Sequence, residues 1–425
     1  MNYTKYDMNG YRLHIIQTEK FKTVRVQMFL KRKIKKEELT IRRLLVETLL
    51  QSSKKYPTRR LLEEHCEDLY GISIGGSNSK SGNFDLITFS ETFLNEKFTE
   101  PGMIKESLEF LFQLLWNPHV KQGKFENYGF DIAKRILKDD IASFQDYPKA
   151  YSSSRLLEEM APDSPISYRR CGYLEDLKKI TTKQLYDYYK DVMENDIMDI
   201  YIVGDVSPEK IRSILQKTFI RSRVAEDPTS HFLPLTEIAK KTKNVREKQP
   251  IKQSHLLMGF NFEPLTDFEL YYTLNVYSYI LGGSGDSLLF KNVREKNSLC
   301  YSISSSYSII SNFLVISADI SAKNYDKTVK LIEDTVQCMK NGEFDDKELD
   351  KAKIIYKNSC IEIMDSPVSI INIYSSHEYL NNDLLEERMK KIDMVTKDMV
   401  ISLANKIHIH TIYMLEGDLD EKKVS

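Results

Sequence analysis

The chain contains an internal duplication, and this feature constrains its fold more than any other. Short matches occur in the same order in both halves of the 425 residues, at shifts near half of the length. They are Asn83-Phe84 with Asn312-Phe313, Ala133-Lys134 with Ala352-Lys353, Asp146-Tyr147-Pro148 with Asp365-Ser366-Pro367, Leu177-Lys178-Lys179-Ile180 with Met389-Lys390-Lys391-Ile392, and Ile202-Val203-Gly204-Asp205-Val206 with Leu415-Glu416-Gly417-Asp418-Leu419. A period this long indicates two homologous domains and not a solenoid of short repeats.

The two halves also share a predicted order of elements. Each is expected to open with a pair of alternating strands, followed by a helix, two further strands, long amphipathic helices and a closing strand. The strands are expected at 11–17, 24–30, 72–77, 85–90 and 198–203, and at 244–248, 253–261, 301–308, 313–320 and 411–416. The helices are expected at 38–51, 104–116 and 124–144, and at 267–281, 325–340 and 346–364. This order predicts an α+β fold, with a largely antiparallel sheet packed against helices in each domain.

The chain is longer than a single hydrophobic core usually supports, so two domains are also expected from its size. The stretch 221–243 is polar, with Asp227-Pro228 and several lysines, which is typical of a linker. We therefore expect an N-terminal domain at 1–220, a linker at 221–243 and a C-terminal domain at 244–425. The two Asp-x-Pro turns are expected to end the long helices, because proline disfavours helical geometry in the residue before it.

Composition excludes several classes of function. With 61 basic and 62 acidic residues, the net charge of -1 gives no electrostatic reason to expect nucleic acid or an anionic membrane as partner. The N-terminus has no apolar run of signal-peptide length. The five cysteines are widely spaced and form no Cys-x-x-Cys pair. This usage predicts reduced thiols in a cytoplasmic protein and no disulfide framework or thiolate metal site.

A zinc peptidase site on a helix requires two histidines one turn apart, with a glutamate between them to polarise the bound water. None of the eight histidines has another histidine three or four residues later, so no such site is expected. The acidic run around His65 and Cys66 is interpreted as a solvated helix face, and His377 as ordinary helix surface. His408 and His410 are expected on one face of a strand, without a carboxylate or cysteine nearby, and therefore not as metal ligands.

A second constellation lies in the C-terminal half. Leu281-Gly282-Gly283 is expected to end a helix, and Arg294 and Tyr301 follow seven residues apart. No Gly-Lys-[Ser/Thr] follows the glycines, so the turn is not a phosphate loop. A guanidinium and a phenol suit a tetrahedral intermediate, because both donate hydrogen bonds to a developing oxyanion. The alternatives are a structural ion pair for Arg294 and a half-buried strand aromatic for Tyr301.

Along nearly its whole length the chain resembles the pitrilysin/insulinase family of zinc peptidases. The resemblance rests on the duplicated domains, the glycine turn, the segment Phe290-x-x-x-Arg294-Glu295-Lys296 and Tyr301. It implies two homologous domains that form half of a clam shell. In that family an inverted His-x-x-Glu-His motif lies on the first long helix, where this chain has Arg43, Val46 and Glu47. The resemblance also assigns substrate binding to the glycine turn, Gly282 and Gly283, together with Arg294 and Tyr301.

The resemblance therefore implies a catalytically incomplete subunit of a heterodimeric metallopeptidase that cleaves small peptides. This chain would bind no metal, and a zinc-bearing relative would be its partner. It is most similar to the bacterial, cytosolic members that accompany such a relative. Two alternatives remain open: a non-enzymatic structural or peptide-binding protein, and an autonomous enzyme with unconventional ligands such as His65. A homodimer would have two Arg/Tyr half-sites and no zinc, so it is expected to be inert.

Overall fold

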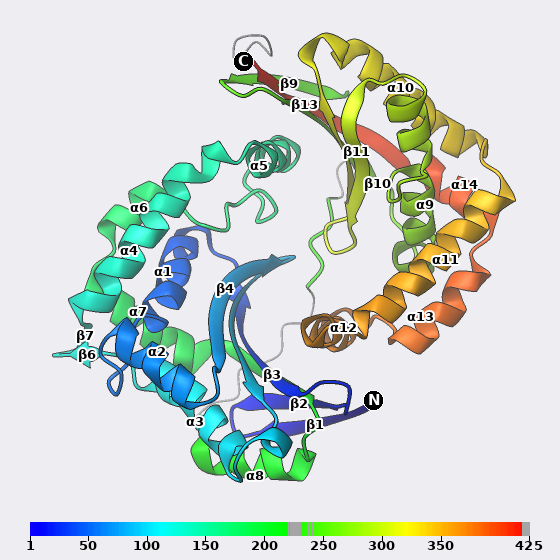
Figure 1. Cartoon of the computed structure of the whole chain (residues 1–425). Helices are drawn as coiled ribbons and strands as arrows, with labels where there is room; N and C mark the ends of the chain where they lie inside the picture. Colours follow the sequence, from blue (N-terminus) through cyan, green and yellow to red (C-terminus); the bar gives the residue numbers. More distant parts are fainter. Residues whose placement is uncertain (220, 222–230, 236–237, 240, 419–425) are drawn as a thin grey trace. The chain divides into compact units, whose positions relative to one another are not determined.

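The computed structural model describes the chain except residues 220, 222–230, 236–237, 240 and 419–425, and it contains two large sheets (Figure 1). The six strands of the first sheet lie in the order β1-β2-β8-β3-β5-β4. The five strands of the second lie in the order β11-β12-β10-β13-β9. Most neighbours are antiparallel, and the parallel pairs are β2 with β8 and β9 with β13. The predicted α+β class with largely antiparallel sheets is confirmed.

The strands are β1 (Asn2–Met8), β2 (Tyr11–Gln17), β3 (Thr23–Lys33), β4 (Ser73–Ser81), β5 (Phe84–Leu94), β6 (Val120–Lys121), β7 (Lys124–Phe125), β8 (Ile197–Gly204), β9 (Lys243–Gln249), β10 (Ser254–Phe262), β11 (Cys300–Ser308), β12 (Phe313–Ile320) and β13 (Ile407–Gly417). The α-helices are α1 (Leu39–Leu49), α2 (Arg59–Asp68), α3 (Met103–Trp116), α4 (Asn127–Ala142), α5 (Pro148–Met160), α6 (Leu174–Lys179), α7 (Thr182–Asn195), α8 (Pro208–Thr218), α9 (Leu274–Leu281), α10 (Tyr325–Asn341), α11 (Asp346–Ile363), α12 (Pro367–Leu380), α13 (Leu385–Lys391) and α14 (Lys397–Asn405). Two π-helical turns, η4 (Glu269–Thr273) and η5 (Phe290–Glu295), flank α9 in sequence.

Two local predictions differ from the structure. The polar strand β1 was not predicted, because only Met8 of its seven residues is buried and it forms an edge of the sheet. The helix predicted at 124–144 begins only at Asn127, since Lys124 and Phe125 form the second strand of a short hairpin. Among the described residues, no helix is both long and apolar enough to cross a bilayer.

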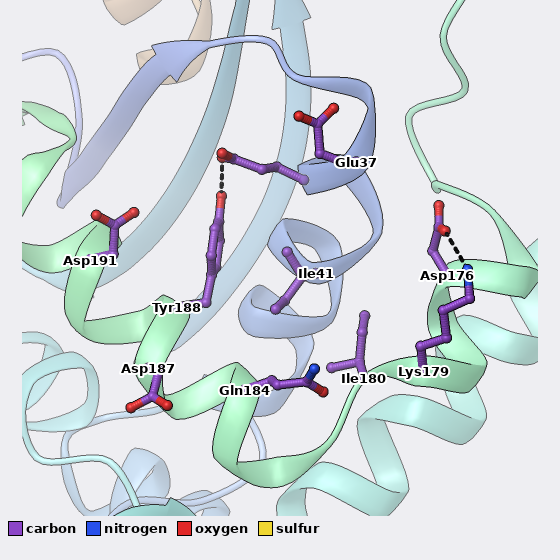
Figure 2. Close-up of a pocket in the computed structure, with 10 residues that line it drawn as sticks. Glu37, Ile41, Asp176, Lys179, Ile180, Gln184, Asp187, Tyr188 and Asp191 are labelled. Atoms are coloured by element: carbon purple, nitrogen blue, oxygen red, sulfur yellow. Dashed lines mark hydrogen bonds and ion pairs between the residues drawn. The ribbon is translucent and has the colours of Figure 1, made fainter.

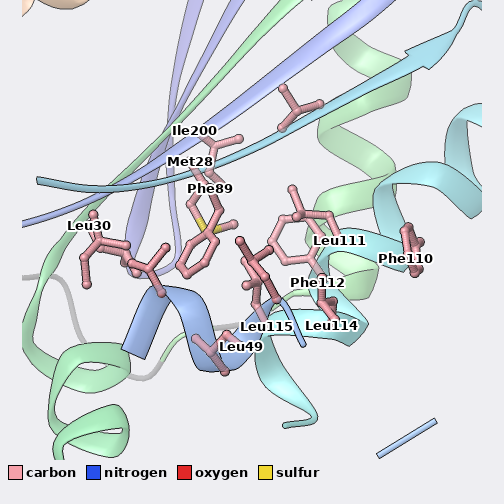
Figure 3. Close-up of a cluster of buried hydrophobic side chains, with 14 of the residues drawn as sticks. Met28, Leu30, Leu49, Phe89, Phe110, Leu111, Phe112, Leu114, Leu115 and Ile200 are labelled. Carbon is pink, nitrogen blue, oxygen red and sulfur yellow. The ribbon is translucent and has the colours of Figure 1, made fainter. Parts of the chain in front are cut away.

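One face of the first sheet packs against helices of its own half. Met28 and Phe89 of the sheet lie in the same buried cluster as Leu49 of α1 and Leu115 of α3 (Figure 3). These side chains come from alternate strand positions and from one face of each helix, as amphipathic packing requires. The cluster holds α1 firmly against the sheet.

The other face of each sheet is covered by a helix from the opposite half of the sequence. Ile370 and Ile371 of α12 pack with Phe29 of the first sheet. Leu156 and Met160 of α5 pack with the second sheet. Accordingly, the chain divides into two compact units, one formed by 1–143, 168–231 and 366–375, the other by 144–167, 232–365 and 376–425.

The repeated Asp-x-Pro turns also mark where the two exchanged helices begin. Pro148 and Pro367 are the first residues of α5 and α12, the two exchanged helices, where proline is well tolerated. The exchange also explains a difference in β10, which was predicted to alternate but is buried at all nine positions. A strand covered on both faces requires a continuous apolar run.

The domain boundaries at 220 and 244 stay a prediction. Most of the predicted linker, at 222–230, 236–237 and 240, lies outside the described residues. Arg221, at its start, is buried and donates hydrogen bonds to the carbonyls of Gly10, Met193 and Asp196.

Candidate functional site

In the first unit, the helix that would carry the zinc ligands carries an ion pair. On α1 the Nη2 atom of Arg43 lies 2.7 Å from Oε1 of Glu47, one turn away, and 3.7 Å from Oδ2 of Asp140. Val46, between them, is buried in the core. Zinc ligands must offer a lone pair, which a guanidinium cannot do, so these residues do not fit the metal. Nowhere in the described chain do three His, Cys, Asp or Glu side chains gather as a metal site.

The neighbouring Arg42 is structural. Its side chain is 1% exposed and pairs with Asp85 at 2.5 Å and Asp196 at 2.9 Å, while Nη2 donates to the carbonyl of Leu30 at 3.3 Å. Burial raises the pKa of the Asp85 carboxyl, and the charge of Arg42 opposes that shift. This pairing satisfies the buried guanidinium within the fold.

A cavity of about 580 Å³ lies beside the start of α1 and is lined by Glu37, Ile41, Tyr188 and several carboxylates (Figure 2). Its acidic groups are largely compensated by cations. Asp187 pairs with Lys183 at 2.7 Å and Lys190 at 2.9 Å. None of the three positions expected for the zinc motif lines this cavity. The cavity therefore provides no substitute metal centre.

In the second unit, the glycine turn holds α9 against the edge strand β11. The amides of Gly282 and Gly283 donate to the carbonyl of Ser278 at 3.0 and 2.8 Å, and the carbonyl of Gly282 accepts from the amide of Ser305 at 3.1 Å. A Cβ atom on Gly282 would lie only 2.8 Å from that amide nitrogen. The turn is therefore a close-packing device, and direct contact of the glycines with substrate stays a prediction.

Arg294 lies near the end of the π-helical turn η5, a geometry that is frequent at functional sites. Its Cζ atom is 4.7 Å from the ring centroid of Phe290, one π-helical turn earlier in the chain. No carboxylate forms an ion pair with it in the part of the chain that the structure describes. The alternative of a structural ion pair is therefore not observed here.

Tyr301 lies in β11, where the register against β12 shifts between Cys300 and Ser302. A bulge of this kind redirects a side chain out of the strand, and bulges are over-represented next to active sites. The Tyr301 side chain is 67% exposed, so it is not the half-buried aromatic of the alternative reading. The local fold presents the phenol to solvent.

Cys300 precedes Tyr301 in β11, and the charge of Arg294 acts on its thiol. Burial raises the pKa of the Cys300 thiol to about 11, and the positive charge of Arg294 acts in the opposite direction. The guanidinium is therefore close enough to the residue before Tyr301 to act on its thiol. The described residues show no hydrogen bond between the Arg294 and Tyr301 side chains.

A polar network beside Tyr301 was missed from the sequence. Asp319 of β12 accepts a hydrogen bond from Ser302 at 2.6 Å and pairs with His255 at 2.7 Å and Lys149 at 2.7 Å. Burial would raise the pKa of Asp319, but these three partners hold it below its ordinary value. Only the strand register and the exchanged helix α5, which carries Lys149, bring the four together, so no local signal predicted them.

The structure also bears on three interpretations made from the sequence, which concern the acidic stretch around His65, His377 and His408. The acidic stretch after Arg59 is a solvated helix face as predicted, with i,i+4 pairs such as Arg60 to Glu64 at 2.7 Å. The Nδ1 atom of His377 donates a hydrogen bond to the backbone carbonyl of Asn382, 2.8 Å away. The expectation that His408 has no carboxylate nearby was wrong, because the antiparallel pairing of β10 with β13 places Glu263, just after β10, at 2.8 Å.

Comparisons with known proteins agree with this geometry. Residues 179–356 match the family model described as the peptidase M16 inactive domain. The chain is 29% identical over 422 residues, 98% of both chains, to the probable inactive metalloprotease YmfF of Bacillus subtilis. It is 26% identical over 278 residues, 64% of this chain and 66% of the other, to the uncharacterized zinc protease YmxG of the same bacterium. A crystal structure of a conserved protein from Enterococcus faecalis V583 superposes with a TM-score of 0.90 at 26% identity, covering 99% of this chain and 100% of that one.

The family and the type expected from the sequence are thus confirmed. The absent zinc motif is consistent with the word inactive in the descriptions of the family model and of YmfF. This chain is therefore similar to the M16 zinc peptidases, and within them to proteins that are described as inactive.

Proposed function

We propose that this chain is the catalytically incomplete subunit of a heterodimeric zinc metallopeptidase of the cytoplasm. A zinc-bearing relative supplies the metal, and this chain supplies Arg294, Tyr301 and the surface shaped by the glycine turn. The substrates are small peptides. The two side chains would bind the peptide and donate hydrogen bonds to the oxyanion that forms at the scissile carbonyl, and the partner's zinc would supply the activated water.

The observation that carries this proposal is the unsatisfied state of the pair. A solvent-exposed tyrosine on a bulge contributes little to the fold of this unit, and so does an arginine that has no carboxylate partner among the described residues. Donors that the fold does not consume are available to a ligand. Tyr301 also lies near the start of an edge strand, and an exposed strand edge offers backbone groups to an extended peptide.

The test is reconstitution with a zinc-bearing M16 relative from the same organism. Peptide cleavage is expected from the mixture and not from this chain alone. Arg294→Ala and Tyr301→Phe are expected to leave pairing intact, as measured by size-exclusion chromatography, and to lower turnover by on the order of 10²–10³ for the arginine.

Matched controls are available in the same chain. Arg246→Ala removes another exposed guanidinium that lies over an aromatic ring, and Tyr147→Phe removes a phenol that is 63% exposed. Both are expected to retain wild-type turnover. Wild-type turnover from both Arg294→Ala and Tyr301→Phe would contradict the catalytic role. Peptide binding by this chain, with no relative that pairs with it, would favour the alternative of a non-enzymatic peptide-binding protein.

A further inference from the structure

The second unit contains a cavity of about 260 Å³ on the helix side of its sheet. Its walls come from η4 and α9, the end of β11, α11 and the start of α13. The phenol rings of Tyr271, Tyr307 and Tyr356 line it together with Asn382, Cys360 and Arg388. Tyr307 packs with the core on the helix side, whereas the Ser302–Asp319 network lies on the opposite face of the same sheet. This cavity is therefore separate from the Arg294 and Tyr301 region.

Two polar groups in the cavity have unused hydrogen-bonding capacity. The Nε atom of Arg388 donates to the carbonyl of Asp383 at 2.5 Å, but its Nη2 atom is buried and has no acceptor among the described residues. Asn382 is 6% exposed; its Nδ2 atom donates to Ser376 at 3.4 Å, and its Oδ1 atom is buried without a donor. Buried donors and acceptors without partners are uncommon and costly, which calls for an explanation.

Two phenol hydroxyls of the cavity are engaged by the protein. The Tyr271 hydroxyl donates to the carbonyl of Leu380 at 2.7 Å, and the Tyr307 hydroxyl donates to Asn275. Asp383 is engaged by Lys391 at 2.7 Å, and within the described chain no carboxylate forms an ion pair with Arg388. The cavity thus offers one guanidinium donor, one amide acceptor and an aromatic wall.

We propose that this cavity binds a small α-amido or α-amino carboxylate, such as the C-terminal residue of a peptide or a free amino acid. The ligand carboxylate accepts a hydrogen bond from Nη2 of Arg388, and the adjacent N–H donates to Oδ1 of Asn382. An apolar or aromatic side chain then lies against the three phenol rings. Drug-sized ligands occupy pockets of roughly 300–1,000 Å³, so a cavity of this size suits one residue and not an extended peptide.

The proposal is tested by calorimetric titration of the full-length chain with four probes. N-acetyl-L-phenylalanine carries both recognised groups, its C-terminal amide lacks the carboxylate, 3-phenylpropanoate lacks the N–H, and inorganic phosphate is an anion alone. We expect N-acetyl-L-phenylalanine to bind, and each incomplete probe to bind roughly tenfold to a hundredfold more weakly. L-Phenylalanine distinguishes the source, because tighter binding than its N-acetyl derivative would assign the site to free amino acids.

Two variants complete the test. Arg388→Met is expected to abolish binding, whereas Arg246→Ala keeps it. Asn382→Asp adds a carboxylate to the cavity that Arg388 also lines, so it is expected to raise the melting temperature and to abolish binding at the same time. A misfolded variant cannot give that combination. Equal affinity for the carboxylate and its amide, or binding of phosphate alone, would overturn the proposal.

Discussion

Charged residues that the structure describes are paired in one region of this duplicated chain and unpaired in a region of the other half. On α1 of the first unit, Arg42 and Arg43 are both paired with carboxylates of the same unit. In the second unit, Arg294 has no carboxylate partner in the described chain and Tyr301 is 67% exposed. Among the described residues, the arginines of α1 are engaged by the fold, whereas Arg294 and Tyr301 are not.

The comparison separates charged residues that stabilise the fold from polar residues that are available to a ligand. A charge that is buried and paired stabilises the unit that contains it, and removing one partner leaves the other uncompensated. A donor that is exposed and unpaired adds little to stability and is available to a ligand. Substitutions in the first region should therefore change the free energy of unfolding, and substitutions in the second should change turnover.

The largest effect on stability is expected from Arg42→Ala. It leaves Asp85 buried without its guanidinium and Asp196 with Arg32 alone, so the free energy of unfolding should fall by about 3–5 kcal/mol. Denaturant unfolding followed by circular dichroism measures the change. Arg60→Ala, which removes an exposed i,i+4 pair with Glu64, is the control and should cost less than about 0.5 kcal/mol. Similar losses of unfolding free energy from both substitutions would contradict the distinction between buried and exposed ion pairs.

An intermediate effect on the free energy of unfolding is expected from a substitution in the glycine turn. Gly282→Ala places a Cβ atom 2.8 Å from the Ser305 amide and 2.9 Å from the Leu289 side chain, so α9 and β11 must separate. The expected cost is about 1–3 kcal/mol, with lower turnover in the reconstituted complex because the strand that carries Tyr301 moves. Gly285→Ala meets nothing within 4 Å and should stay within about 0.5 kcal/mol of the wild type. If the two variants unfold alike, the turn has no packing role.

A smaller change in stability is expected when the ion pair on α1 is replaced by histidines. The double substitution R43H/E47H removes a partly exposed pair, which should cost less than about 1 kcal/mol. It places two imidazoles one turn apart near Asp140, a ligand set that suits zinc. Zinc analysis after dialysis should show metal bound to the double variant and not to R43H alone. No zinc uptake would mean that the helix has lost the geometry of the site as well as its ligands.

The smallest effect concerns the thiol beside Tyr301. Burial raises the pKa of Cys300 to about 11, so its alkylation near pH 8 should be about a hundredfold slower than in the unfolded chain and should accelerate as pH rises toward that value. The charge of Arg294 lowers this pKa, and Arg294→Ala should therefore slow alkylation a further few-fold. Peptide mass spectrometry after timed labelling reads the rate at Cys300. An unchanged alkylation rate at Cys300 in Arg294→Ala would mean that the guanidinium does not lie near the start of β11.

The sequence predicted much of this arrangement because its signals are local. Helix periodicity, strand alternation and the spacing of Arg294 and Tyr301 depend on neighbouring residues, and the absence of histidine pairs could be checked completely. The exchange of α5 and α12 could not be predicted in this way, since each helix packs on a sheet far away in sequence. The apolar stretch Leu256–Phe260 within β10 and the apolar strand β8 are local signs that both faces are covered.

The most direct test of the central claim is the single-turnover rate of the reconstituted complex with Arg294→Ala, measured together with the melting temperature of this chain. The single-turnover rate with Arg294→Ala is expected to be lower than that of the wild type by a factor on the order of 10²–10³, with the melting temperature unchanged. Arg246→Ala should change neither quantity. A rate equal to that of the wild type, or a loss of rate that is matched by a loss of stability, would contradict the claim that Arg294 serves a zinc ion held by another chain.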